Sequence, residues 1–197
     1  KVKLKPLEKR VHKSKPTKKP EDLFDIKEKT VTEGFVDNYS VSLKQTGETE
    51  HRVWNDLVQR YHYLGYRKLF GLCIRYFIYI DGIVSPVGCI SFTCSTTYRQ
   101  KDRDHWIGWS DEQRVQRLNW ILCNNRMLIF PWIKIQNLAS KSLSLVLLRV
   151  ANDWDIKFNF KPVLVETYVD PSRFTGAMYK AANFIQIGQS SGNYRIN

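Results

Sequence analysis

Apolar residues in the second half of the chain predict strands that each lead into a helix. Runs rich in Ile, Val and Leu at 127–135 and 163–169 predict two strands, which helical segments at 138–154 and 176–182 follow, with a last strand at 184–188. This order brings two helix N-termini to one edge of a sheet. The first N–H groups of a helix lack an intrahelical acceptor and carry partial positive charge, so this edge suits phosphate or another anion.

The preceding segment has the patterns of a helix and a hairpin. Apolar residues at positions i, i+1, i+4, i+5 and i+8 predict an amphipathic helix over 52–61. Two β-rich runs at 72–80 and 83–94 flank Asp81-Gly82, a pair typical of a hairpin turn. The pattern therefore predicts one helix packed on a pair of antiparallel strands.

A polar segment separates this hairpin from the strands of the second half. Residues 95–110 are rich in Arg, Asp and Trp and predict a loop. Ser110 and Gln113 have the spacing of a capping box, which predicts a helix over 111–122 that ends at Asn124-Asn125. Together with the elements above, these patterns predict an α/β (α+β) fold with a mixed, largely antiparallel twisted sheet flanked by helices.

Charge divides the chain into three parts. Residues 1–22 carry nine basic and three acidic residues, half of the net charge of +12, and their Lys- and Pro-rich sequence predicts a flexible arm. Residues 23–50 are expected to form an irregular connector with one short strand at 39–43, and residues 51–197 the folded domain. The excess of positive charge favours an acidic partner, although a solvated basic surface is also compatible with it.

The cysteines and the apolar runs exclude several classes of protein. The spacing of Cys73, Cys89, Cys94 and Cys123 contains no C-x-x-C pair, which predicts buried free thiols and no metal site. No apolar run reaches the roughly eighteen residues of a membrane span, and no signal peptide is visible. A cytoplasmic protein without a membrane partner is therefore expected.

A turn of small and polar residues is the first candidate site. A phosphate cradle needs small side chains, so that backbone N–H groups can approach the anion, and a helix directly after them. We assign this role to Gln136, Asn137, Leu138, Ala139, Ser140 and Lys141. An ordinary strand-to-helix turn remains the alternative.

Two further residues have side chains suited to proton transfer. Tyr179 lies in the last short helix, where its hydroxyl can protonate a leaving thiolate or alkoxide, unless its ring only packs on the sheet. His62 ends the first helix, where the helix dipole favours its charged form, and it is a candidate for substrate binding or base catalysis. The alternative for His62 is a half-buried residue that closes the helix.

A basic and aromatic set predicts contact with nucleic acid. Arg neutralises phosphates, and exposed Trp can stack on unpaired bases. The set comprises Arg67, Arg75, Arg103, Trp106, Arg114, Arg117 and Arg126. Because acidic residues interleave with it at 102–112, a self-paired structural loop is the competing interpretation.

The second half of the chain resembles the core of the GCN5-related N-acetyltransferase (GNAT) superfamily. The order strand, small-residue turn, helix, strand and a helix reading Ala-Met-Tyr-Lys-Ala-Ala-Asn-Phe carries the resemblance. It implies that the turn would hold the pyrophosphate of acetyl-CoA or another acyl-CoA and that Tyr179 would be the general acid. Glu166 interrupts an apolar strand that would border the substrate channel, so it would be the general base, unless it forms an ion pair with Arg126 or Arg75.

Several ordered motifs are similar to those of the DruA family of Druantia anti-phage systems and of transposon-associated relatives. They lie at 60–66, 106–114, 124–126, 137–140, 166–171 and 179–183. The resemblance implies a component of a bacterial defence system, with DNA and other defence subunits as partners.

Three functions remain open from the sequence. The first is a GNAT-like domain that acts on or binds DNA and transfers an acyl group to a nucleobase or a protein amine. The second is a non-catalytic DNA-binding subunit, or a transposon-associated accessory protein, without a cofactor. The third is a nuclease or transposase accessory that binds a metal through Asp102, Asp104 and Glu166.

Overall fold

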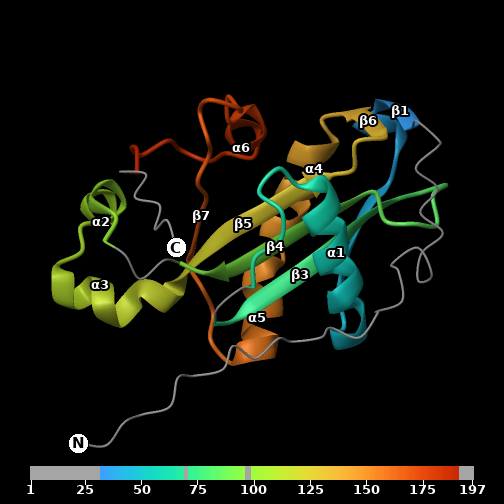
Figure 1. Cartoon of the computed structure of the whole chain (residues 1–197). Coiled ribbons are helices and arrows are strands. Elements are labelled where there is room, and N and C mark those ends of the chain that lie inside the picture. The colour runs from blue at the N-terminus through green and yellow to red at the C-terminus, as the bar shows by residue number, and fades with distance from the viewer. Residues whose placement is uncertain (1–31, 69–70, 96–98, 191–197) are drawn as a thin grey trace, which may run out of the picture.

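The computed structural model describes residues 32–68, 71–95 and 99–190 (Figure 1). A five-stranded sheet has the order β2-β3-β4-β5-β7, and all neighbouring pairs are antiparallel except β5–β7, which is parallel. Its strands are β2 (Val41–Gln45), β3 (Cys73–Ile80), β4 (Gly88–Cys94), β5 (Ile121–Ile129) and β7 (Leu164–Glu166). A second sheet pairs β1 (Thr32–Phe35) with β6 (Ile133–Gln136) in parallel.

Helices cover both faces of the larger sheet. Helix α1 (His51–Tyr61) lies on one face, and α4 (Leu138–Leu147) and α5 (Val150–Phe158) lie on the other (Figure 1). Helices α2 (Lys101–Ile107) and α3 (Asp111–Arg117) project at one end, and α6 (Ala177–Ala181) lies beyond the end of β7. Short 3₁₀ turns occupy Val36–Asn38, Glu48–Glu50 and Leu118–Trp120. The predicted fold class is therefore confirmed.

The predicted apolar stripe of α1 is buried against the sheet. Trp54 is completely buried, and its indole N–H donates to the carbonyl of Tyr76 in β3 (3.0 Å). From the opposite face, Trp154 of α5 is also completely buried. These large rings fill the space between helices and sheet, because burial of an aromatic side chain removes much apolar area from water.

Strands β5 and β7 separate soon after they meet. Their parallel pairing covers only the segment from Ile121 to Cys123, whereas β5 continues to Ile129. At the point of separation β5 carries a bulge, since Ser91 and Phe92 of β4 oppose Arg126 and Asn124 and leave Asn125 as an extra residue. Bulges bend a strand and redirect its side chains. The edge of β5 past Cys123 is therefore open toward the side of β7.

Two predictions for the middle of the chain were wrong. Residues 95–110 were expected to form a loop, but they contain α2, which ends where Gly108 adopts a left-handed conformation (φ 79°). The helix expected over 111–122 ends at 117, and Asn124-Asn125 lie inside β5 rather than ending a helix. Their polar side chains hid this strand, because sequence patterns of strands depend on apolar positions.

Two of the elements expected in the second half are each divided into two shorter ones. The strand predicted over 127–135 is interrupted by a turn that Pro131 favours and that the bond from Ile133 N to the Phe130 carbonyl closes (2.9 Å). The helix predicted over 138–154 is two helices, separated at Arg149, whose guanidinium binds the Leu43 carbonyl (3.1 Å).

The predicted last strand at 184–188 is absent from this part of the structure. Residues 184–188 have no strand pairing, and the next N–H group, that of Gln189, donates to the carboxylate of Asp102 instead (3.1 Å). The tail is therefore fixed to α2 rather than to the sheet. This contact joins residues 87 positions apart in sequence, so local patterns do not reveal it.

The N-terminal predictions are tested only in part. The predicted arm at 1–22, and residues 23–31 of the connector, lie outside the described residues. The one strand expected between residues 32 and 50, at 39–43, corresponds to β2, which forms an edge of the main sheet. Strand β1 was not expected. None of the helices within 32–68, 71–95 and 99–190 has the length and apolar content to cross a bilayer.

Candidate functional site

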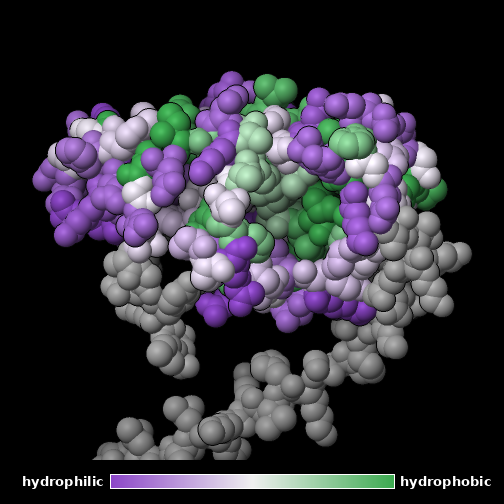
Figure 2. Space-filling model, turned by 90° about the horizontal axis from the view of Figure 1, so that it is seen from above, coloured by the Kyte–Doolittle hydropathy of each residue, from purple (hydrophilic) through white to green (hydrophobic). Residues whose placement is uncertain are grey.

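A pocket with a volume of about 550 Å³ lies along the open edge of β5. The end of α1, the strand β5 itself, the first turn of α4, the segment after β7 and helix α6 all contribute to its walls. The lining residues used below are His62, Tyr63, Leu64, Asn124, Asn125, Met127, Ala139, Thr167, Tyr168, Phe174, Met178 and Tyr179. The view from above shows apolar residues gathered in the middle of the molecule and hydrophilic residues around them (Figure 2).

Tyr179 lies in the wall of this pocket, as the sequence predicted for a site residue. Its hydroxyl donates to Asn124 Oδ1 (2.8 Å). Asn124 is buried, and its amide nitrogen donates to the carbonyls of Ser91 (3.0 Å) and Arg126 (3.2 Å), which fixes the orientation of the amide. Burial raises the pKa of Tyr179 to about 12. At neutral pH the hydroxyl therefore keeps its proton and directs it toward Asn124.

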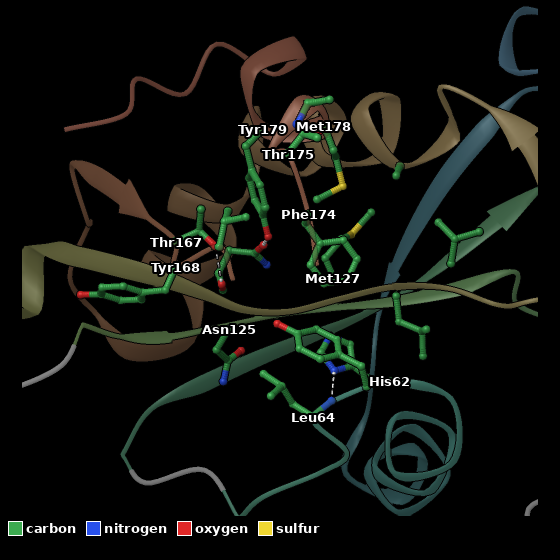
Figure 3. Close-up of a pocket in the computed structure, with 18 of the residues that line it drawn as sticks. His62, Leu64, Asn125, Met127, Thr167, Tyr168, Phe174, Thr175, Met178 and Tyr179 are labelled. Atoms are coloured by element: carbon green, nitrogen blue, oxygen red, sulfur yellow. Dashed lines mark hydrogen bonds between the residues drawn. The ribbon is translucent and has the colours of Figure 1, made fainter. Parts of the chain in front are cut away.

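His62 also lines the pocket, but its expected charge was wrong. Burial, and then the nearby charge of Arg126, lower the pKa of His62 to about 4, so the ring is neutral at neutral pH. The ring nitrogen Nδ1 accepts a hydrogen bond from the Leu64 N–H (3.2 Å; Figure 3). The proton of the neutral ring is therefore on Nε2. This tautomer makes Nε2 a hydrogen-bond donor, and not the base that was considered for this residue.

Glu166 does not line the pocket and belongs to a separate ion-pair cluster. Its carboxylate lies 3.3 Å from Arg103 Nη1 and accepts hydrogen bonds from Ser95 and from Tyr168. The ion-pair alternative was therefore correct in kind, but the partner is Arg103 and not Arg126 or Arg75. A carboxylate held by these three partners has few positions left for a proton from a substrate.

Arg103 is the centre of this ion-pair cluster. Its side chain is only 4% exposed, and its Nη2 atom lies 2.7 Å from Asp104 Oδ1. The predicted contact of Arg103 with nucleic acid is therefore wrong for this structure, because the guanidinium is buried and paired. The guanidinium also lies between Asp104 and Glu166, where the metal alternative required a cation. No group of three or more metal-binding side chains occurs among the residues that the structure describes.

The predicted phosphate turn reaches the pocket through one residue. Ala139 lines the pocket, and the first bond inside α4 runs from Lys141 N to the Asn137 carbonyl (3.0 Å). The N–H groups of residues 138–140 therefore have no acceptor within the helix. Asn137 has a left-handed conformation (φ 65°) and its side chain makes no cap, contrary to expectation. Gln136 and Lys141 are exposed.

The predicted basic set is dispersed over several elements. Arg75 of β3 lies over the Trp54 ring, and Arg117 of α3 lies over the Trp120 ring. Arg67 and Trp106 are exposed, whereas Arg114 lies near Asp104, with 3.8 Å between the closest charged atoms. Arg126 is half-buried and donates to the carbonyls of Gly65 and Asn125. The set therefore does not form one continuous surface.

Several pocket residues were missed by the sequence analysis. Asn124 and Asn125 were assigned to a helix end, although two adjacent amides inside an apolar run are unusual enough to signal a site. Tyr63 and Phe174 contribute exposed rings to the wall, with exposed fractions of 42% and 50%. Single aromatic residues in loops give no periodic signal, so no pattern identified them.

Comparison with solved structures finds proteins that are similar in fold. A solved structure of AAC(6')-Iy in complex with the bisubstrate analogue CoA-S-monomethyl-acetylneamine has a TM-score of 0.51 and 11% identity, and the match covers 80% of this chain and 99% of that one. A probable acetyltransferase has a TM-score of 0.47 and 13% identity, over 79% of this chain and 97% of that one. The first likeness shows that the two chains share the GNAT fold.

Sequence comparison gives the family directly. No curated protein matches the chain. The family model described as Druantia protein DruA matches residues 2–197, which is nearly the whole sequence. This chain therefore belongs to the DruA family.

Proposed function

We propose that this chain binds acyl-CoA in the pocket at the open edge of β5 and transfers the acyl group within a bacterial anti-phage defence system. Membership of the DruA family supports the defence role and the presence of other subunits. One observation carries the rest: a single pocket contains both Ala139, in the first turn of α4, and Tyr179. The likeness to a GNAT enzyme bound to a CoA analogue supports the same ligand.

The residues of the pocket fit an acyl-CoA. The N–H groups of residues 138–140 would bind the pyrophosphate, since they lie at a helix N-terminus and Ala139 leaves room for the anion. Lys141 is exposed, so it leaves the turn open. The sulfur-containing side chains of Met127 and Met178 provide apolar walls beyond this turn. The volume is also within the range of ordinary ligand pockets, about 300–1,000 Å³.

Tyr179 is the proton donor in the proposed reaction. A bound acyl-CoA supplies a thioester, at which an amine forms a C–N bond while the C–S bond breaks. The amine proton would pass to water, Tyr179 would donate its hydroxyl proton to the sulfur whose bond breaks, and water would return a proton to the Tyr179 oxygen. Its pKa of about 12 keeps this proton in place until a thiolate approaches. For the transfer, the hydroxyl must turn away from Asn124.

A second candidate is a non-catalytic subunit that binds DNA. The residues described in the pocket wall include no Asp or Glu that could act as a base, and Glu166 lies in the ion-pair cluster. An amine would therefore have to arrive uncharged. The net charge of +12 favours DNA as a partner under either candidate.

Acetyl-CoA binding is tested by thermal unfolding of the full chain. We expect millimolar acetyl-CoA to raise the melting temperature, because a ligand that binds only the folded state stabilises it. Ser140→Asp should remove this shift, since the new charge repels pyrophosphate although a carboxylate at a helix N-terminus stabilises the helix itself. Asn152→Asp is the matched control, because it adds the same charge to the first turn of α5, outside the pocket.

Tyr179→Phe separates binding from transfer. This variant should keep the acetyl-CoA shift but lose about a hundredfold in acyl transfer to DNA, measured with radiolabelled acetyl-CoA. Equal, measurable transfer by Tyr179→Phe and the natural chain would assign the acid to another group, whereas no transfer by the natural chain would favour the non-catalytic candidate. No shift with acetyl-CoA in the natural chain would overturn the proposed ligand.

A further inference from the structure

The pocket has a second, aromatic side near the end of α1. In Figure 3, Thr175, Met178 and Tyr179 lie on one side of the strand that crosses the view, and His62, Leu64 and Asn125 lie on the other. The His62 and Tyr63 rings are stacked, with 4.8 Å between their centroids. The pocket therefore continues past the edge of β5 to a wall that the acyl-CoA assignment does not use.

Two exposed rings from distant segments meet at this wall. The centroids of Tyr63, after α1, and Phe174, before α6, are 5.1 Å apart, and their planes are inclined by 59°. The guanidinium of Arg173 lies 5.3 Å from the Tyr63 centroid. Exposed aromatic rings that flank a pocket offer flat apolar surfaces, on which a planar ligand can stack.

Hydrogen-bond donors face the same region. Asn125 Oδ1 accepts from the Ser91 hydroxyl (2.7 Å), so the Asn125 amide nitrogen is the group oriented to donate elsewhere. The neutral His62 ring holds its proton on Nε2, because Nδ1 already accepts from Leu64. A ligand on this side would therefore present acceptors such as carbonyl or ring nitrogen atoms.

Positive charge accompanies the rings and the donors. Arg126 Nε donates to the carbonyl of Gly65 (3.0 Å), and the exposed Arg67 follows Gly65 by two residues, which places both arginines near the wall. Arg173 adds a third guanidinium, although Asp170 lies 3.6 Å from it. Positive charges beside one pocket favour an anionic ligand, and phosphates are natural partners of arginine.

We propose that this aromatic side of the pocket binds an unpaired nucleotide of a nucleic acid. The base stacks on Tyr63 and Phe174 and accepts hydrogen bonds from Asn125 and His62, while Arg67, Arg126 and Arg173 neutralise the flanking phosphates. A base can offer its face only when it has left the duplex stack. The inference rests on the proposed function, because an exocyclic amino group of this base is the acyl acceptor.

Binding of labelled oligonucleotides to the full chain tests the site by fluorescence anisotropy. The natural chain should bind a 12-nucleotide single strand more tightly than the duplex of the same sequence at equal salt. Tyr63→Ala and Phe174→Ala should each weaken single-strand binding by about tenfold or more, since stacking on one aromatic ring contributes about 1–3 kcal/mol per base. Tyr63→Trp, which keeps a ring, should restore it.

Phe35→Ala is the matched control, because Phe35 has a similarly exposed ring (59%) in β1, outside the pocket. It should leave affinity unchanged. Equal losses in Phe35→Ala and Tyr63→Ala, or no loss in Tyr63→Ala, would overturn the site. A parallel series with RNA of the same sequence identifies which nucleic acid supplies the nucleotide, and preference for either one over the duplex supports the site.

The acetyl-CoA shift of the same variants separates this inference from the proposed function. Tyr63→Ala and Phe174→Ala should keep the shift, because neither ring belongs to the first turn of α4, where the pyrophosphate is proposed to bind. If the natural chain shows no shift but the ring variants still lose single-strand binding, the proposed function fails and the nucleotide site stands. If the shift is present and ring variants bind normally, only the nucleotide site fails.

Discussion

Two polar clusters lie near the split between β5 and β7, and they differ in access to a ligand. In the first, Tyr179 and Asn124 are joined at 2.8 Å in the wall of a pocket. In the second, Arg103, Asp104 and Glu166 form ion pairs with side chains that are at most 13% exposed. The sequence analysis named candidate site residues in both clusters, Tyr179 in the first and Arg103 and Glu166 in the second.

The difference shows that a polar residue in an apolar strand has two explanations. A buried charge requires a partner, and Glu166 finds one in Arg103 from α2, a helix that the sequence did not predict. Tyr179 has a neutral partner and an open side. Pairing with an opposite charge therefore indicates a structural role, whereas a neutral contact beside a cavity leaves the group available for chemistry.

The largest expected effect is the loss of the charge at the centre of the ion-pair cluster. Arg103→Met should lower the free energy of unfolding by about 3–5 kcal/mol, because it leaves Asp104 and Glu166 buried without their partner. Urea denaturation measures the change. Arg99→Ala is the control: Arg99 and Asp111 form an exposed pair, so it should cost less than about 1 kcal/mol. Similar losses in both variants would remove the distinction between buried cluster and surface.

A smaller effect is expected when only one carboxylate of the ion-pair cluster is neutralised. Glu166→Gln keeps the shape and retains Asp104 as the partner of Arg103, so it should lower the free energy of unfolding by about 1–3 kcal/mol. Because Glu166 does not line the pocket, acyl transfer per folded molecule should be unchanged. A variant with natural stability and no transfer would restore Glu166 as the general base.

The sequence predicted the architecture better than the contacts within it. Amphipathic spacing located α1 and the hairpin of β3 and β4, because these elements depend on local patterns of apolar residues. The prediction failed for α2, whose first turn is charged on every side and becomes stable only when Arg103 and Asp104 are buried. It failed again at the break between α4 and α5, where Arg149 bonds the carbonyl of Leu43 in a distant strand.

The candidate site was predicted in part for the same reason. His62, Ala139 and Tyr179 were found because each lies at the end or on one face of a predictable element, and they meet in one pocket. The aromatic wall could not be found, since Tyr63 and Phe174 are brought together only by the fold. The tautomer of His62 also depends on a contact two residues away, which composition does not encode.

The smallest expected effect concerns the pH dependence that His62 gives to the pocket. Its folded pKa of about 4 is lower than the ordinary value near 6.5, so the unfolded chain takes up this proton first as pH falls. The contribution of His62 to stability is therefore complete above about pH 6.5 and is lost progressively toward pH 4.

The variant His62→Asn keeps an acceptor for the Leu64 N–H but cannot titrate, so its stability should fall less over this range. Urea denaturation at pH 7, 5.5 and 4.5 measures the difference. Parallel curves for both proteins would show that the ring ionises as readily in the folded protein as in the unfolded chain, and the low pKa attributed to the burial of His62 would then be wrong.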